Sequence, residues 1–381
     1  MFKITPEWEN NNLKLPILEY LGYLITKFFD FFKPISFLLD KVETLMLQND
    51  ITRLNIDKPI YITGLARAGT TIILEMLSKH PDLASHQYKH VLMPYLPFWL
   101  PYLIKNTGIY VKPIERIHKD GIMITRDSPE AVEEVFWRKF FNDTHNETIS
   151  NIIKGNVYNP KFERFYKNHI VKLLLSQNRS RYLAKNNYNI TRLEYLLKIF
   201  PNSKFLLLIR NPINHIASLI KQTKLLIALE QQIPFLHDWM LIVGHQEFGH
   251  HQVCINVDNT ELIHKIRKLW RNQETYVKGW AYYWDSVYNF IADQLDINKK
   301  LKSATLIIDY DKLCETPAKK IDEILDHIEI STVNFKETRN YYITNLHKPT
   351  YYTPDFSEKE LAQISEVTKL TAARFGINSL I

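Results

Sequence analysis

The residues with the clearest chemical potential form one short segment, Gly64 to Thr71, which reads GLARAGTT. The chain has only ten glycines, yet two of them lie five apart here and are followed by two threonines. This is the spacing of the phosphate-binding P-loop, GxxxxGK[ST], with Thr70 in the lysine position. Its glycines let successive N–H groups point inward, and a following helix adds the positive end of its dipole. The predicted anion-binding residues are Gly64, Arg67, Ala68, Gly69, Thr70 and Thr71.

A second basic group is predicted at the end of an apolar run, 204–210. Arg210 closes this run, and Ser218 follows eight residues later. Ligands bind α/β sheets at the edge where parallel strands end. Pro212 predicts a helix start beside Arg210, and a helix N-terminus favours an anion. A guanidinium with a nearby hydroxyl suits a phosphate, so we predict a second anion site at Arg210 and Ser218.

The lysine missing from the loop separates two reaction classes. Nucleoside triphosphatases place that lysine on the outer phosphates and hold Mg²⁺ with an acidic residue. This loop offers Arg67 and no lysine, which favours a nucleotide with a shorter anion at its 5′ end. An ATP-dependent and Mg²⁺-dependent phosphotransferase is the first alternative, and a nucleotide-binding protein without turnover is the second.

The flanking sequence predicts the elements that position these groups. A β-branched run at 60–63 precedes the loop, helical periodicity follows at 72–79, and further strands are predicted at 204–210 and 304–310. Continuous apolar runs are typical of strands buried on both faces. We therefore predict an α/β fold, a P-loop-type, mostly parallel sheet flanked by helices. The other predicted helices are 128–142, 161–178, 191–200, 213–231 and 261–295.

The predicted organisation is a helical N-terminal extension, 1–57, followed by one α/β domain, 58–381. Helical insertions at about 85–180 and 220–300 are expected on the acceptor side of this domain. The most lipid-like run, 20–39, contains three charged residues and a proline, which disfavours a membrane-spanning helix. We expect an amphipathic helix that packs on the domain, with peripheral contact to a membrane surface as the alternative.

Composition restricts the class of protein. Hydrophobic residues make up 45% of the 381 residues, and there are two cysteines, so disorder and a disulfide scaffold are excluded. The cysteines lack zinc-site spacing, and the start of the chain lacks secretory-signal features. We therefore expect a cytoplasmic protein without a metal, with membrane association as the alternative. The net charge of +7 is spread along the chain, which favours an anionic ligand over nucleic acid.

Taken together, the two sites resemble the sulfotransferase family, whose donor is 3′-phosphoadenosine 5′-phosphosulfate (PAPS). The family loop GxxRSGTT is matched except at Ala68, where serine is usual. Arg210 and Ser218 match the arginine and serine that bind the donor's 3′-phosphate. The stretches RYLAKNNYNITRLEYLLKIFPNSKFLLLIRNP and LIIDYDKLCETP extend the resemblance over about 58–330. It implies metal-free, in-line sulfuryl transfer from PAPS to a hydroxyl or amine acceptor.

Such a transfer needs a group that removes the acceptor's proton. In related enzymes this base is a histidine or glutamate on loops after the first helix. The candidates here are, in order, His118, Glu130 and His90. Asp127 to Glu130 reads as a capped helix start, which predicts that Glu130 and Glu134 share one helix face. We expect these two acids and Glu133 to lie on the solvent-exposed face of that predicted helix.

The acceptor, the histidine-rich segment GHQEFGHH and the aromatic residues of 276–291 are considered last. The acceptor is a small molecule, a saccharide or a lipid, and the oligomeric state is undetermined. The segment GHQEFGHH contains His245, His250 and His251 but lacks clear metal-ligand spacing apart from Glu247, so we expect an acceptor-side loop. The aromatic residues of 276–291 fall at helical spacing, which predicts core positions for them, namely Trp280, Trp284 and Tyr288.

Overall fold

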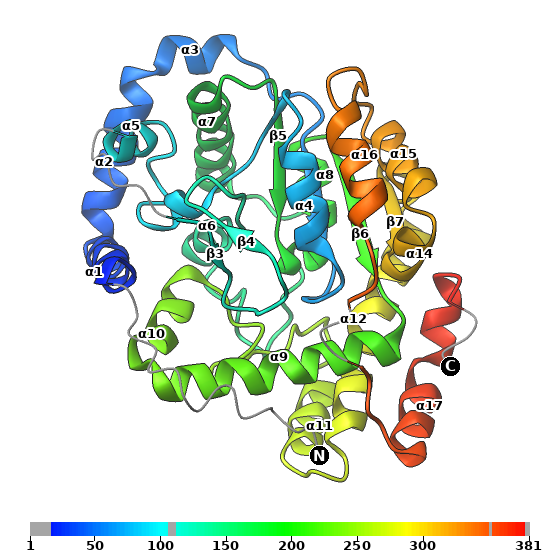
Figure 1. The fold of residues 1–381 in the computed structure, drawn as a ribbon. Coiled ribbons are helices and arrows are strands. Elements are labelled where there is room, and N and C mark those ends of the chain that lie inside the picture. Colours follow the sequence, from blue (N-terminus) through cyan, green and yellow to red (C-terminus); the bar gives the residue numbers. More distant parts are fainter. Residues whose placement is uncertain (1–16, 106–111, 350–352, 378–381) are drawn as a thin grey trace.

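The computed structural model describes residues 17–105, 112–349 and 353–377. Its centre is a five-stranded sheet in the order β2-β5-β1-β6-β7 (Figure 1). All four strand pairs of this sheet are parallel, which confirms the predicted fold class. The strands are β1 (Ile60–Thr63), β2 (Leu83–Ala84), β5 (Arg181–Lys185), β6 (Lys204–Ile209) and β7 (Thr305–Asp309).

Alternate residues of the strands enter two separate cores. Phe205, Leu207 and Ile209 of β6 pack with the helices on one face, and Leu206 and Leu208 pack on the other, as the two-residue period of a strand requires. The first face is covered by α7 (Pro160–Gln177), α8 (Leu193–Ile199), α9 (Pro212–Gln232), α12 (Tyr276–Ile297) and α17 (Glu358–Arg374). The second is covered by α4 (Thr70–Ser78), α14 (Tyr310–Glu315), α15 (Pro317–His327) and α16 (Lys336–Asn345).

The predicted helix over 128–142 is wrong at its start, because α6 spans only Glu134–Phe140. The preceding residues pair with another segment of the chain instead. Tyr88 N donates to Ser128 O at 3.0 Å, and Glu130 N donates to His86 O at 2.9 Å. Ser128 N also donates to Thr125 O at 3.2 Å and closes a turn, so Asp127 to Glu130 does not cap a helix.

The predicted helix over 261–295 is two helices, α11 (Thr260–Trp270) and α12. The predicted core aromatics of α12, Trp280, Trp284 and Tyr288, are fully buried, which confirms that prediction. Shorter elements complete the described fold: η2 (Tyr88–Val91), α5 (Trp99–Lys105), β3 (Ile114–Glu115), β4 (Met123–Ile124), η3 (Asn187–Thr191), α10 (Pro234–Val243) and α13 (Lys299–Ala304).

The N-terminal helices form an arm along one side of the domain (Figure 1). They are α1 (Ile17–Phe31), α2 (Lys33–Met46) and α3 (Gln48–Arg53). On the inner side of α2, Asp40 and Glu43 pair with the buried Lys172 of α7 at 2.6 and 2.9 Å. Among the described helices, none combines the length and the apolar character that crossing a bilayer requires.

Buried histidines contribute to the packing around the sheet. Trp284 Nε1 donates to His215 Nδ1 at 3.2 Å, so His215 Nε2 carries the proton and donates to Ala66 O at 2.8 Å. His86 Nε2 lies 2.8 Å from His169 Nε2, so one of these two atoms must be unprotonated. Burial lowers the pKa of both His86 and His215 to about 3.

We predict that these neutral histidines make the fold sensitive to acid. The unfolded chain binds their protons below about pH 6.5 while the folded chain does not, so stability is present above that pH and is lost as the pH falls. At about pH 5 each such histidine lowers the free energy of unfolding by about 2 kcal/mol. In His215→Gln, the loss between about pH 7 and about pH 5 should therefore be about 2 kcal/mol smaller than in the parent chain. Urea unfolding at both pH values measures this, and an equal loss in the two proteins would contradict it.

Candidate anion-binding and active site

The predicted loop joins β1 to α4 and depends on its two glycines. Gly69 has a φ of +97°, and a Cβ there would lie 2.2 Å from Cδ2 of Tyr310. Gly64 has a φ of +143°, and its Cβ would lie 2.4 Å from the carbonyl oxygen of Leu208. Among the described residues, no side chain caps the N-terminus of α4. The first amide groups of α4 are therefore available to an anion.

Arg67 connects the loop to the second predicted site. Its Nε donates to Ser218 Oγ of α9 at 3.3 Å, and its Nη1 donates to Asp120 Oδ2 at 2.9 Å. Asp120 lies between β3 and β4 and also pairs with Arg116, whose Nη1 donates to Thr71 Oγ1 at 3.3 Å. Burial would raise the pKa of Asp120, but hydrogen bonds and charge from Arg116 and Arg67 hold it below its usual range. The structure thus brings Arg67 and Ser218 together, as one anion site requires.

Arg210 follows β6 directly and faces the start of α14. Its guanidinium lies over the ring of Tyr310, 5.4 Å from the centroid, and its Nε is 3.8 Å from Asp311 Oδ1. Asn211 N donates to the other oxygen of Asp311 at 3.1 Å. The same Tyr310 ring contacts Gly69 of the loop. The carboxyl ends of β1, β6 and β7 therefore meet where the sequence predicted two anion sites.

Two of the three predicted base candidates lie beside this loop. Burial is the largest cause that lowers the pKa of His118, and the positive charges of Arg116, Arg67 and Lys185 lower it further. The Nδ1 atom of His118 has no hydrogen-bond partner among the described residues. Burial lowers the pKa of Lys185, and the negative charge of the nearby Glu130 opposes this shift. His118 and Glu130 thus share one cluster of charges.

His90 lies elsewhere. Its Nδ1 accepts from Gln87 N at 2.9 Å and closes a capping box at the start of η2, and its ring is buried against His86. Burial and the charges of His86 and Lys89, rather than of loop residues, lower its pKa. This is the place of a packing histidine in the core.

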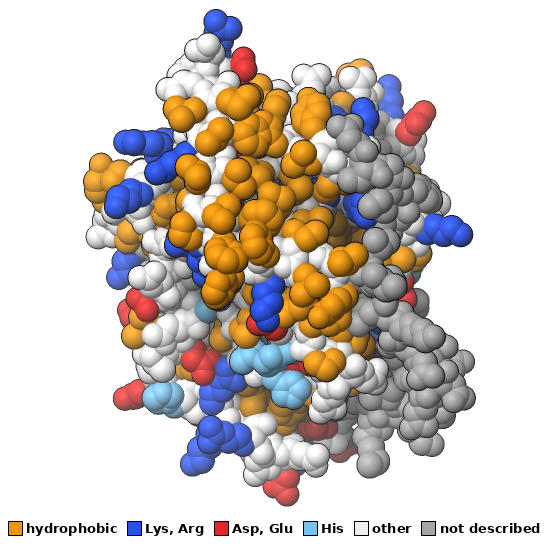
Figure 2. Space-filling view, turned by 90° about the vertical axis from the view of Figure 1, so that its left-hand side faces the viewer, with side chains coloured by type: hydrophobic (Ala, Val, Ile, Leu, Met, Phe, Trp, Pro, Cys, Tyr) orange, Lys and Arg blue, Asp and Glu red, His pale blue; other side chains and the backbone are white. Residues whose placement is uncertain are grey.

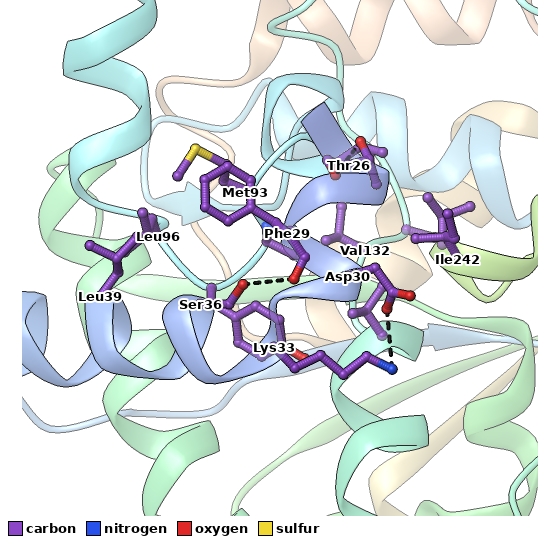
Figure 3. Close-up of a pocket in the computed structure, with 16 residues that line it drawn as sticks. Thr26, Phe29, Asp30, Lys33, Ser36, Leu39, Met93, Leu96, Val132 and Ile242 are labelled. Atoms are coloured by element: carbon purple, nitrogen blue, oxygen red, sulfur yellow. Dashed lines mark hydrogen bonds and ion pairs between the residues drawn. The ribbon is translucent and has the colours of Figure 1, made fainter. Parts of the chain in front are cut away.

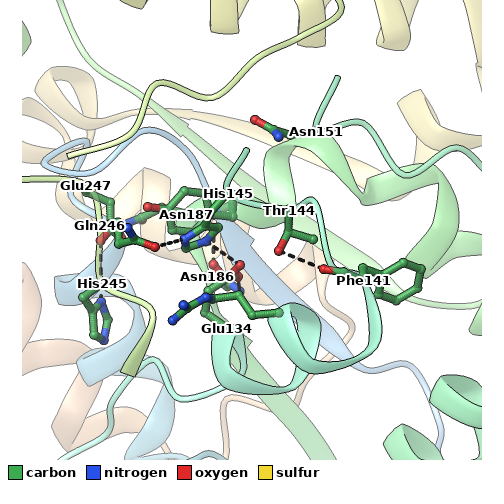
Figure 4. A network of polar contacts seen from close by, with 12 residues as sticks. Glu134, Phe141, Thr144, His145, Asn151, Asn186, Asn187, His245, Gln246 and Glu247 are labelled. Carbon is green, nitrogen blue, oxygen red and sulfur yellow. Dashed lines mark hydrogen bonds and ion pairs between the residues drawn. The ribbon is translucent and has the colours of Figure 1, made fainter. Parts of the chain in front are cut away.

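The expected solvated face of the acids is wrong for Glu133 and Glu134, which are both buried. Glu134 accepts from both terminal nitrogens of Arg192 at 2.7 and 2.8 Å, from Asn186 at 2.7 Å, and lies 2.8 Å from His145 Nε2 (Figure 4). Glu133 accepts hydrogen bonds from the hydroxyls of two tyrosines, Tyr166 and Tyr182. The later start of α6 turns both carboxylates into the core.

The sequence prediction missed a polar chain that reaches Thr70. Thr70 Oγ1 donates to Asn187 Oδ1 at 3.4 Å, and Asn187 Nδ2 donates to Glu247 Oε1 at 2.8 Å. Glu247 lies 3.6 Å from His245 Nδ1 (Figure 4). Burial opposes ionisation of Glu247, but His245, Lys185 and Asn187 together lower its pKa to about 2. Glu247 between the histidines of GHQEFGHH was the sequence signal for this group.

The described residues contain one group of side chains with the geometry to hold a metal ion. One ligand atom from each of Glu230, His237 and His250 lies within 4.8 Å of the other two. Glu230 Oε2 is 2.6 Å from His250 Nδ1, and Glu230 Oε1 is 3.8 Å from His237 Nδ1. The expectation that the protein uses no metal remains a prediction.

Comparison with known proteins finds a match over the segment that carries both predicted anion sites. Residues 59–233 match the model of the sulfotransferase family. Solved structures similar to this chain include sulfotransferase STF1 from Mycobacterium tuberculosis H37Rv, with 14% identity, 93% of this chain and 86% of that chain covered, and a TM-score of 0.46. Sulfotransferase STF9 from Mycobacterium avium is 14% identical, with 88% of this chain and 79% of that chain covered and a TM-score of 0.48. No curated protein matches the chain.

We predict that Gly69→Ala is more damaging than Gly121→Ala, a matched control. Both glycines have positive φ, at +97° and +79°, so both substitutions strain the backbone. The new methyl group at Gly69 overlaps the side chain of Tyr310, whereas no atom of the described residues lies within 4 Å of a Cβ placed at Gly121. The overlap should lower the free energy of unfolding by about 1–3 kcal/mol beyond the loss in Gly121→Ala. Urea unfolding of both variants measures this, and equal losses would contradict the close contact.

Proposed function

We propose that this chain, whose residues 59–233 match the model of the sulfotransferase family, transfers a sulfuryl group from PAPS to a hydroxyl or amine acceptor. The observation that carries the proposal is the Arg67 to Ser218 hydrogen bond of 3.3 Å. This bond joins the P-loop-like turn to α9, the helix that follows Arg210. One ligand with an anionic group at each end would contact both places.

The residues present fit such a nucleotide. The uncapped amide groups of α4, Arg67 and the hydroxyl of Thr71 would hold the 5′ phosphosulfate. Arg210 and Ser218 would hold the 3′-phosphate. Both arginines lie beside carboxylates, Asp120 at 2.9 Å and Asp311 at 3.8 Å. A phosphate oxygen would compete with these carboxylates for the same guanidinium donors.

The absence of lysine from the loop supports the same donor. Thr70 occupies the lysine position. Its hydroxyl donates to Asn187, which lies just after the end of β5. It supplies no cation for the outer phosphate of a triphosphate. A donor with a single phosphate before the transferred group needs no such cation beyond Arg67.

The proposed reaction is an in-line displacement at sulfur. The bond from the acceptor oxygen or nitrogen to sulfur forms as the bond from sulfur to the bridging phosphate oxygen breaks, and the acceptor's proton passes to the base. His118 is the proposed base, because its Nδ1 is unpartnered beside Arg67 and Lys185, and Glu130 is the second candidate. Lys185 and Arg67 would stabilise the charge on the departing oxygen.

We predict that Arg210→Ala weakens binding of 3′-phosphoadenosine 5′-phosphate, the desulfated donor, about tenfold to a hundredfold. Loss of a hydrogen bond to a charged group costs about 1.5–3 kcal/mol. AMP lacks the 3′-phosphate, so its affinity should be unchanged by this substitution. Isothermal titration calorimetry in EDTA measures both affinities.

Arg339→Ala is the control, because Arg339 pairs with Asp322 at the surface, and its affinities should equal those of the parent chain. If Arg210→Ala still prefers the 3′-phosphorylated nucleotide over AMP as strongly as the parent does, the assignment of Arg210 is wrong. Binding only of ATP with Mg²⁺ would favour the phosphotransferase alternative.

We predict that His118→Ala slows transfer of the sulfuryl group to water, the acceptor that is always present, by about 10²–10⁴-fold. Release of 3′-phosphoadenosine 5′-phosphate from PAPS measures this rate. Affinity for the released nucleotide should change less than about threefold, because His118 would act on the acceptor rather than on the phosphates. A loss in Glu130→Gln with none in His118→Ala would instead identify Glu130 as the base.

A further inference from the structure

The second helix, α2, has its polar and apolar sides in an unusual arrangement. Asp40 and Glu43 point inward and pair with Lys172, which is fully buried. Glu43 also accepts from the backbone N of Trp99 at 2.7 Å. On the outer side the helix presents Leu38 and Leu45, which are 60% and 68% exposed. The acids are therefore inside and large apolar side chains are outside.

The ion pairs show that this orientation is required by the fold. Rotating α2 to bury its leucines would carry Asp40 and Glu43 to the surface. It would leave the ammonium of Lys172 buried without a counter-charge, which proteins avoid. The apolar outer side of α2 is thus fixed by the interior of the domain.

The outer sides of α1, α2 and α5 form one continuous apolar surface. We call it the docking face and define it by its exposed side chains, Phe28, Phe31, Leu38, Leu45, Met46 and Leu103. Figure 2 shows hydrophobic side chains gathered over the side of the molecule where these helices lie. Phe31 is 77% exposed. Monomeric soluble proteins rarely expose so broad an apolar patch, and such patches mark interaction sites.

The charges on these helices select the partner. Lys33 and Lys41 of α2 and Lys105 of α5 are exposed. Among the described side chains of the three helices, the acids are the inward Asp40 and Glu43, and Asp30, which lies 3.4 Å from Lys33. An apolar face with lysines and almost no outward acid fits the surface of a bilayer that contains anionic lipids.

The same lysines argue against a second copy of the chain. In a two-fold symmetric dimer the same face of each copy meets the other, so residues of like charge are brought close. Among the described side chains of these helices, Asp30 is the one outward acid that could neutralise them. A membrane surface supplies both the apolar layer and the anions.

We propose that α1, α2 and α5 dock this protein onto the surface of an anionic membrane. The helices lie in the plane of the interface with Phe31 and Leu38 among the lipid tails and the lysines at the headgroups. With 15 and 14 residues, α1 and α2 are too short to span a bilayer separately.

A hollow beneath the two helices separates them from the segment of the domain that follows Glu130. It lies between Phe29 and Leu39 on the helix side and Val132 and Ile242 on the domain side (Figure 3). Ala131, also in its lining, directly follows Glu130. Docking through these helices would therefore hold the segment that carries Glu130 close to the membrane surface.

Co-sedimentation of the full chain with vesicles tests the proposal. Vesicles of phosphatidylcholine alone are compared with an equal mixture of phosphatidylcholine and phosphatidylglycerol. We expect binding to the anionic vesicles and a loss of at least about tenfold in Phe31→Glu/Leu38→Glu, the size of effect produced by removing two buried apolar side chains and adding two like charges. Lys33→Glu/Lys41→Glu should bind both kinds of vesicle equally weakly.

The matched control is Val333→Glu/Leu370→Glu, which changes two side chains that are 70% and 83% exposed outside the docking face, and it should bind like the parent chain. Unchanged nucleotide affinity of each variant shows that it is folded. Equal binding of Phe31→Glu/Leu38→Glu and the parent would overturn the proposal. So would a parent that ignores vesicles but is a dimer by light scattering and becomes a monomer in that variant, because the face would then join two copies.

Discussion

The carboxylate of Glu134 is buried and would be unstable there without its partners. Two nitrogens of Arg192 and the amide of Asn186 donate to it, and His145 lies at hydrogen-bond distance. Removing one member of such a buried group leaves an uncompensated charge, at a typical cost of about 3–5 kcal/mol. These partners come from two segments of the chain, the one from Asn186 to Arg192 that follows β5 and the loop that holds His145, so the ion pair fixes the strand end and that loop relative to α6.

The positions next to these partners carry the polar groups that face the loop. Asn187 follows Asn186 and contacts both Thr70 and Glu247. Gln246, which lies 2.5 Å from His145 Nδ1, precedes Glu247. The interior ion pair and the candidate site thus share backbone segments, and the charged core is part of what orders the site.

Local sequence was sufficient to predict the loop and its strands. Two glycines five apart, a β-branched run before them, and the continuous apolar run ending at Arg210 each appear within a few residues. β5 was missed because charged residues, Arg181 and Lys185, lie at both its ends and leave an apolar run of only three residues between them. Their burial depends on neighbouring strands that come from distant parts of the sequence.

The misplaced helix start and the missed site residues share a non-local cause. Residues 126–130 do not start a helix, because backbone hydrogen bonds join them to residues 86–89, which no local pattern reveals. Asp120 matters through Arg67, 53 residues away, and Glu247 through Asn187, 60 residues away. Residue type indicated which groups could act, and only the fold determined which of them meet.

The ring of Tyr310 contacts Gly69 and also lies under the guanidinium of Arg210. One rigid aromatic ring therefore contacts both of the proposed anion-binding places and limits how far they can move relative to each other. A ligand that binds at both places must match the separation that this shared ring helps to hold. Two anions joined by a linker of the wrong length could satisfy either arginine but not both at once.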